Sequence, residues 1–255
     1  MDAMLAGTAR ERSVSNDEES GRAFRVAAGV LVLGYVGVQA FQAYVFGAFA
    51  VPADARAELL QGAARLHVAR SALMLVWMFA LIFVSWVICA QAVRKHPVLA
   101  TAAFLGFFLF GMFEVALRSV ELFWLQVQLP ADYLGTTDPL LGAAILDKAA
   151  TFKAVQHAMY FPLIFGPWLG SIGVYFLFPG RPRIHWALKS VMAVAVLRMT
   201  VRLLTYGGIE LISMATYERV YFLLVLIEHL PKAYWLFRVR DEQLASAGAS
   251  VDVAP

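Results

Sequence analysis

The amino-acid sequence predicts an all-α integral membrane protein with about six transmembrane helices in one bundle. Hydrophobic residues make up 61% of the chain and charged residues only 15%, whereas soluble domains average about 45–50% apolar and about 25% charged residues. About six apolar runs are long enough to cross a bilayer, which takes roughly 20 helical residues. This composition excludes disordered, collagen-like and nucleic-acid-binding proteins, which need a low apolar content, a short repeat or a dense basic patch.

Each expected span ends at a proline, a glycine or a basic residue, the residue types that end helices or mark a membrane boundary. The spans cover residues 26–51, 71–93, 98–128, 152–178, 184–206 and 215–237. The residues that stop them are, in the same order, Pro52, Arg94 with Lys95, Pro130, Pro179 with Gly180, Gly207 with Gly208, and Arg238 with Arg240.

The segments outside the spans divide the chain into a tail, a transmembrane domain and a second tail. Residues 1–24 are polar with mixed charge and residues 241–255 are small and polar, so both are expected to be disordered cytoplasmic tails. Residues 25–240 form the six-helix transmembrane domain. Among its connectors, residues 53–70 have the pattern of a short amphipathic helix, and residues 131–150 are expected to form a turn-rich loop with an interfacial helix.

The distribution of basic residues predicts the orientation. With the N-terminus inside, eleven of the 21 Lys and Arg residues fall in or within a few residues of the tails and the second and fourth connectors, and five fall in or near the connectors of the opposite side. Basic residues are enriched in cytoplasmic loops. Both termini are therefore expected in the cytoplasm, and the lipid bilayer is the expected partner of the apolar surface.

Three segments carry a resemblance to a known family. They are GMFEVALRSVELF at 111–123, GVYFLFPGRPR at 173–183 and LIEHLPKAYWLFRVR at 226–240. With the order of elements over residues 25–240, they resemble a family of bacterial six-helix membrane proteins known only as a domain of unknown function. The resemblance implies a multi-pass protein of the bacterial cytoplasmic (inner) membrane, and it implies no activity, cofactor or site residue.

Ionisable side chains inside the expected spans are candidates for a ligand or ion path, because charge within a bilayer is costly and by default marks function. The candidates are Glu114, Arg118, Glu121, His157, Arg198, Arg202 and Glu228. At 1.5 Å per residue, Glu114 lies roughly 24 Å from the cytoplasmic end of its span. The acid and base of the third span, Glu114 and Arg118, are expected to meet the two arginines of the fifth span. This arrangement predicts an outward-facing charged cavity within the membrane.

A structural interpretation of the same charges stays open. Acids and bases in the spans nearly cancel, as ion pairs that join helices would require. In the last span, Glu228 and Lys232 are four residues apart and can pair, and Pro231 between them should kink the helix. Alternatively, Lys232 extends to the cytoplasmic headgroups.

The fourth span combines prolines with small residues. Pro162 and Pro167 predict a bend. Gly166 and Gly170 are four residues apart, which lets another helix backbone approach closely. A hinge at a binding site is the functional interpretation of this motif, and tight packing is the favoured one.

No motif of known chemistry is present. The sequence lacks HExxH, GxSxG, a Walker motif and a dinucleotide fingerprint, so no cofactor or metal is predicted. The lone Cys89 excludes an internal disulfide. The leading hypothesis is a membrane protein whose cavity binds or passes a small solute or ion. The alternatives are a non-catalytic membrane subunit or scaffold with structural ion pairs, whose protein partners are not indicated, and a membrane-embedded enzyme acting on a lipid through Glu114, His157 and Glu228.

Overall fold

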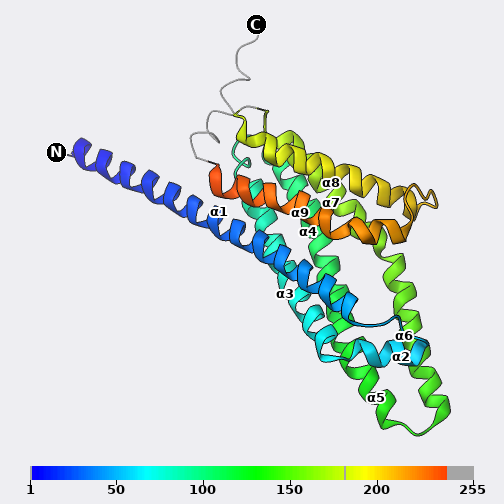
Figure 1. Ribbon diagram of the computed structural model, residues 1–255. Coiled ribbons are helices and arrows are strands. Elements are labelled where there is room, and N and C mark those ends of the chain that lie inside the picture. The colour runs from blue at the N-terminus through cyan, green and yellow to red at the C-terminus, as the bar shows by residue number, and fades with distance from the viewer. Residues whose placement is uncertain (1, 181, 240–255) are drawn as a thin grey trace.

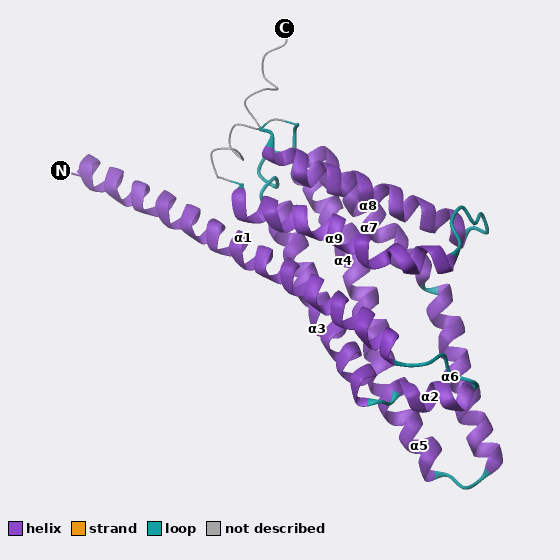
Figure 2. Cartoon of the chain, in the orientation of Figure 1, coloured by secondary structure: helices purple, strands orange, loops and turns teal. Residues whose placement is uncertain are grey.

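The structure, a computed structural model, describes residues 2–180 and 182–239, and it describes the side chains of these residues from residue 20 onward except residue 214. The described chain consists of helices joined by short turns (Figures 1 and 2). The elements are α1 (Asp2–Ala48), α2 (Ala55–Gly62), α3 (Arg65–Ala90), α4 (Pro97–Ser119), the π-helix η1 (Val120–Gln128), α5 (Leu129–Gly135), α6 (Pro139–Ala158), α7 (Tyr160–Leu177), α8 (Ile184–Tyr206) and α9 (Met214–Arg238).

Five helical stretches are long and apolar enough to cross a membrane. They are Ser20–Ala48, Arg65–Ala90, Pro97–Gly135, Pro139–Leu177 and Ala215–Arg238. They confirm the all-α class and the prediction of a multi-span helical protein. The expected fifth span is the helix α8, with the predicted bounds 184–206, but its three cations Lys189, Arg198 and Arg202 leave it less apolar than the other five.

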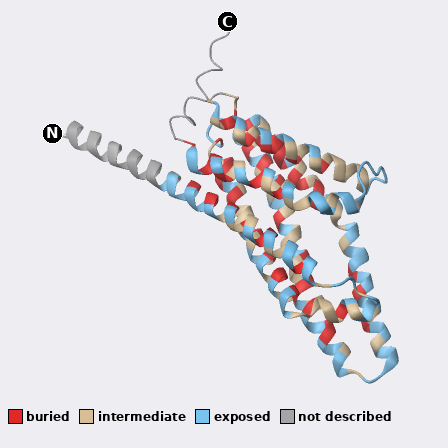
Figure 3. Ribbon diagram, in the orientation of Figure 1, coloured by how far each residue is buried: buried red, intermediate tan, exposed pale blue. Residues whose placement is uncertain are grey.

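Two of these stretches are longer than a membrane requires. Pro97–Gly135 and Pro139–Leu177 have 39 residues each, about 58 Å at 1.5 Å per residue, against a hydrocarbon core of about 30 Å. Their far ends, with α2, form a projection from the bundle (Figure 1), and we call α2, η1, α5 and α6 the cap. Its own small core contains Leu59, Ile145 and Ala149. Much of α6 is exposed (Figure 3).

The cap corrects the prediction for residues 131–150. The expected turn-rich loop is confined to residues 136–138, because α6 begins at Pro139. Proline fits the first helical position, where no backbone donor is needed. The Asp138 side chain caps the helix by accepting a hydrogen bond from the Leu140 backbone N–H at 2.8 Å. The cap at Asp138 and the proline at the first helical position therefore favour a helix in this segment, although its glycine and proline content favoured a loop.

Other segment predictions had mixed outcomes. The amphipathic helix expected within residues 53–70 is α2, and Asp54 caps it by accepting from the Ala57 N–H at 2.7 Å. The structure differs from the tail expected at residues 1–24, since α1 begins at Asp2. This segment contains no proline to interrupt the helix. The tail expected at residues 241–255 lies outside the described residues.

The helices α4 and α7 pack with their backbones almost in contact. A Cβ atom added to Gly106 would lie 2.6 Å from the Gly166 carbonyl oxygen. One added to Gly170 would lie 3.0 Å from the Ala103 carbonyl oxygen. Such distances leave no room for a side chain, so these glycines permit the close approach. The prediction that Gly166 and Gly170 face another helix is confirmed.

The fourth expected span is interrupted ahead of its first proline. α6 ends at Ala158 and α7 resumes after Met159, whereas Pro167 lies inside the continuous part of α7. Pro162 has no N–H to offer the Ala158 carbonyl, and its ring crowds that oxygen. The hydroxyl of Tyr206 on α8 donates to this carbonyl instead, at 3.3 Å. The turn between α8 and α9 is thereby held beside the α6–α7 junction.

Candidate functional site

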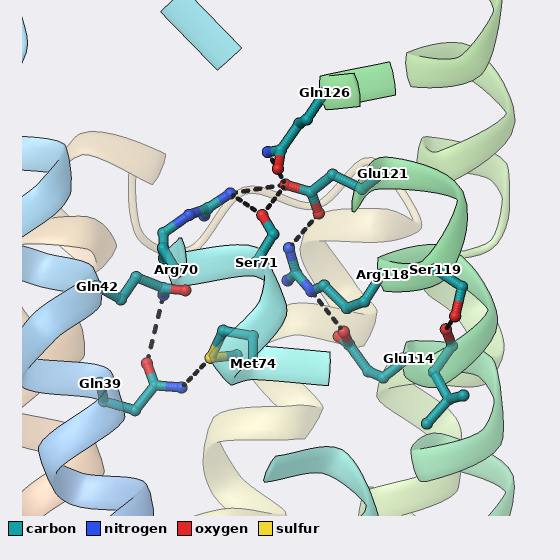
Figure 4. Close-up of polar contacts among 11 residues, drawn as sticks. Gln39, Gln42, Arg70, Ser71, Met74, Glu114, Arg118, Ser119, Glu121 and Gln126 are labelled. Atoms are coloured by element: carbon teal, nitrogen blue, oxygen red, sulfur yellow. Dashed lines mark hydrogen bonds and ion pairs between the residues drawn. The ribbon is translucent and has the colours of Figure 1, made fainter. Parts of the chain in front are cut away.

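The first charged cluster joins α3 to α4 and η1 (Figure 4). We call it the Glu121 network, and its members are Arg70, Ser71, Glu114, Arg118, Glu121 and Gln126. Arg70 Nη2 lies 2.6 Å from Glu121 Oε1, and Arg118 Nη1 lies 2.6 Å from Glu121 Oε2. Arg118 Nε also donates to Glu114 Oε2 at 3.1 Å. Two arginines and two glutamates thus neutralise one another.

The π-helix explains how Glu121 collects so many donors. Backbone hydrogen bonds of a π-helix join residues five apart, which brings residues i and i+5 to nearly the same side of the helix. Gln126, five residues after Glu121, donates from Nε2 to Glu121 Oε1 at 3.2 Å. Ser71 Oγ donates to the same oxygen at 3.3 Å. Glu121 is only 9% exposed, and a buried carboxylate persists when its oxygens are hydrogen-bonded in this way.

The second charged cluster joins α8 to α9. The guanidinium of Arg198 binds the carboxylate of Glu228 in a bidentate pair, with Nε 2.5 Å from Oε1 and Nη2 2.8 Å from Oε2. Each residue lies 14 positions after the first residue of its helix, roughly 21 Å along it. The pair therefore sits near the middle of both helices, where desolvation makes an unpaired charge most costly.

A cavity of about 110 Å³ lies beside this pair in the centre of the bundle, and we call it the central cavity. Arg198, Glu228, His229 and Lys232 contribute its ionisable wall, and Tyr35 packs against the His229 ring at 4.9 Å between centroids. The His229 Nδ1 atom is hydrogen-bonded to the Val225 carbonyl. Lys232 has no hydrogen bond or ion pair within the described residues, although it lies within electrostatic range of Glu228.

A second cavity, of about 140 Å³, lies at the turn between α8 and α9, and we call it the turn cavity. Its wall includes Arg202, Tyr160, Tyr217 and the exposed His157. The Arg202 guanidinium carbon lies 5.2 Å from the centroid of the Tyr217 ring and 5.9 Å from that of Tyr160. Arg202 makes cation–π contacts, and it pairs with no acidic side chain in the part of the chain that the structure describes.

Tyr217 connects the two cavities. Its hydroxyl accepts a hydrogen bond from Arg198 Nη1 at 3.2 Å and another from Arg202 Nη1 at 3.5 Å. Arg202 faces the turn cavity, and Arg198 faces the central cavity. A row of polar groups therefore leads from the α8–α9 turn to the middle of the bundle.

The structure does not gather the seven predicted site residues into one cavity. His157, Arg202, Arg198 and Glu228 lie along the turn and central cavities, whereas Glu114, Arg118 and Glu121 belong to the Glu121 network. Glu114 and Arg118 were expected to contact the arginines of α8. Instead, Arg118 pairs with Glu114 and with Glu121. Tyr35 and Tyr221 lie between the clusters, within electrostatic range of both Glu114 and Arg198.

The sequence left open whether Glu228 pairs with Lys232 four residues away. In the structure Glu228 pairs with Arg198 of the neighbouring helix. Sequence reasoning missed Arg70, which was expected in a connector, because α3 begins six residues earlier than predicted. It also missed Tyr217, because nothing in the sequence around this tyrosine indicates that its hydroxyl accepts hydrogen bonds from two arginines. Glu114, His157 and Glu228, the three acid–base candidates, are engaged in separate contacts.

Comparison with known proteins identifies no relative. No protein-family model, no curated protein and no solved structure matches this chain. Within the described residues, no group of three or more His, Cys, Asp or Glu side chains is arranged to hold a metal ion. Inferences about function therefore depend on the geometry and charge of the two clusters and their cavities.

Proposed function

We propose that the protein is a six-span membrane protein with both termini in the cytoplasm, and that its central cavity binds a small anion that enters through the turn cavity. The observation that carries this proposal is the excess of positive charge along α8 and α9. Three cations, Arg198, Arg202 and Lys232, face the two cavities with the single acid Glu228. Glu228 is already engaged by Arg198.

The chemistry of the central cavity supports an anion over a cation. An entering anion would lie near Lys232, whose ammonium carries three donors, and near the remaining donors of Arg198. A cation would meet the same two groups with like charge. The volume of about 110 Å³ suits a few non-hydrogen atoms, so the proposed ligand is an inorganic anion or a short carboxylate.

The contacts of α8 support its assignment as a membrane span in addition to the five long apolar stretches. Two of its three cations bond to backbone carbonyls or to an acid: Lys189 Nζ donates to the carbonyl oxygens of Tyr175 and Phe178 at 2.8 and 3.1 Å, and Arg198 is paired with Glu228. Polar groups in a membrane helix are tolerated when they pair with carbonyls or with each other. The location in a bacterial inner membrane, and membership of the family that the sequence resembles, are part of the same proposal.

Anion flux through the reconstituted protein tests this function. Liposomes containing the full chain and an anion-sensitive dye are exposed in turn to chloride, nitrate, phosphate and acetate. We expect uptake of at least one anion above that of empty liposomes, and stabilisation of the detergent-purified protein by the same anion. Lys232→Met should lower both effects by about tenfold or more, the scale on which loss of a charged partner acts.

The matched control is Lys148→Met, which removes an exposed lysine on α6 and should change neither uptake nor stabilisation. The proposal is overturned if Lys232→Met retains wild-type anion effects, or if only cations stabilise the protein. Because Lys232 has no hydrogen-bond or ion-pair partner to lose among the described residues, this variant should keep its fold.

A second candidate function, a non-catalytic membrane subunit or scaffold, is favoured by the Glu121 network. Every charge in that network is paired, and its bonds join α3 to α4 and η1. This is the arrangement expected of ion pairs that hold helices together. Absence of any anion effect on a well-folded protein would favour this second function.

A further inference from the structure

A cavity larger than either charged cavity lies away from both of them, between the cap, the end of α1 and the beginning of α3. It has a volume of about 310 Å³, and we call it the cap cavity. Volumes of this size are at the lower end of those that hold small organic ligands. Side chains of α2, α6 and η1 form most of its wall, so it would not exist without the helical cap.

The wall of the cap cavity is largely apolar. Leu59 of α2, Leu125 of η1 and Leu146 and Ala149 of α6 contribute to it. Such a wall favours a hydrocarbon body in the cavity, because transfer of apolar surface out of water is favourable.

Two buried polar atoms in the same wall have no partner. Gln126 Oε1 and His67 Nε2 are buried without a hydrogen bond in the described structure. Gln126 is 5% exposed and His67 is 9% exposed. An unsatisfied buried polar atom costs about 1–3 kcal/mol, so a ligand that bonds to both atoms would gain affinity.

The charges around the cavity indicate an uncharged ligand. Glu58 and Lys153, both on the wall, form an ion pair with each other. Arg70, the nearby buried cation, is paired with Glu121. The two atoms without partners belong to an amide and an imidazole. A charged head group would therefore meet no uncompensated charge of opposite sign, and its desolvation would be costly.

We propose that the cap cavity binds a neutral amphiphile, with a hydrocarbon body against the leucine wall and a hydroxyl head against Gln126 and His67. One hydroxyl can donate to Gln126 Oε1 and accept from the imidazole N–H, which satisfies both atoms at once. The site is distinct from the proposed anion path, since the two share no lining residue.

The position of the cavity suits a ligand that arrives from the membrane. Counting about 20 residues along α4 from Pro97 spans a hydrocarbon core of about 30 Å and ends near Leu117. Gln126 lies beyond that point, on η1. The cavity would therefore open at the level of the headgroups, where an amphiphile places its hydroxyl.

Photolabelling of the full chain in liposomes tests the proposal. The probe is an octanol that carries a diazirine on its alkyl chain, with peptide mapping of the labelled sites. We expect labelling concentrated on α2, η1 and α6, competed by 1-octanol and much less by n-octane or sodium octanoate. Gln126→Leu should lower this labelling by about tenfold, and Gln128→Leu, an exposed neighbour on η1, should leave it unchanged.

A second variant guards against damage to the Glu121 network, because Gln126 also bonds to Glu121. Ala150→Phe fills the cavity from α6 at an exposed position and should also abolish the labelling. Equal competition by n-octane and 1-octanol would overturn the proposal. So would labelling that persists in both variants, which would mean that water alone satisfies the two polar atoms.

Discussion

Arg70 Nη2 lies 2.6 Å from Glu121 Oε1, so the beginning of α3 is tied to the π-helix that follows α4. The two glutamates that flank Arg118 consequently differ in importance. Glu121 holds arginines on two helices, whereas Glu114 holds only the arginine one turn away on its own helix.

Replacing Glu121 should therefore cost more stability than replacing Glu114. Glu121→Gln leaves Arg70 buried without its acid, and breaking a buried pair in this way costs about 3–5 kcal/mol. Glu114→Gln should cost less, because Arg118 keeps its bond to Glu121. Denaturant unfolding in detergent measures both values, with the exposed Glu218→Gln as the control. Equal losses for Glu114 and Glu121 would contradict the network as described.

Arg198 and Glu228 should behave as direct partners in a double-mutant cycle. Each of Arg198→Gln and Glu228→Gln leaves one buried charge alone and should destabilise the protein by about 3–5 kcal/mol. The double variant should recover much of that loss. The pair Glu114→Gln with Arg198→Gln should show little such recovery, since the two residues are not bonded to each other. Strong coupling in the second cycle and none in the first would show that the pairing is wrong.

The recovered double variant also separates function from structure. If the Arg198–Glu228 pair only holds α8 and α9 together, restoring stability should restore every property of the protein. If it is part of an anion site, the stable double variant should still lack the anion effects of the wild type.

Hydropathy and helix start and stop signals predicted the positions of the helices well. They predicted poorly which charged side chains pair with each other. Apolar runs located α3, α4, α8 and α9 because a membrane helix must satisfy its backbone internally over about 20 residues. The extension of α6 back to Pro139 was missed, because its exposed surface lacks a continuous apolar run. Glu114 and Arg118 were expected to meet the arginines of the fifth span, but they pair with each other at the four-residue spacing that suits neighbours on one helix.

Ion pairs between two helices depend on how far the helices are shifted along and rotated about their axes relative to each other. The spacing of residues along the sequence does not give this information. A bond between Glu228 and Lys232 within α9 was one of two interpretations left open by the sequence, and Glu228 instead bonds to Arg198 of α8. The π-helical geometry of η1 was likewise unpredictable from periodicity, because an α-helical pattern assigns Gln126 to a different face from Glu121. Burial of single side chains is easier to infer: Cys89 lies inside an apolar run, which indicates a buried side chain, and it is buried.

The glycine contact between α4 and α7 should be intolerant of side chains. Gly170→Leu would place atoms against the Ala103 carbonyl and the Phe107 ring, both within 3.0 Å of where a Cβ atom would lie, and should lower the melting temperature by several degrees or prevent folding. Gly37→Leu is the control, since no atom lies within 4 Å of its Cβ position. A wild-type melting temperature for Gly170→Leu would refute the packing.

The orientation proposed for the spans can be read with reporter fusions. A phosphatase active only outside the cytoplasm should be silent when fused after Val93 and active when fused after Pro130, because the basic connectors are retained inside. A reporter that is active only in the cytoplasm should give the opposite pattern. Activity of the phosphatase at Val93 together with silence at Pro130 would reverse the topology.

The π-helix η1 also requires a fixed number of residues between α4 and α5. Each residue added to or removed from an α-helix turns everything beyond it by about 100°, and the nine residues of η1 join α4 to α5 without a loop to absorb such a change. Losing one residue there would swing the Gln126 amide away from Glu121 and carry α5 around the axis of α4. The number of residues between Arg118 and Gln126 is therefore as important to the Glu121 network as their chemistry.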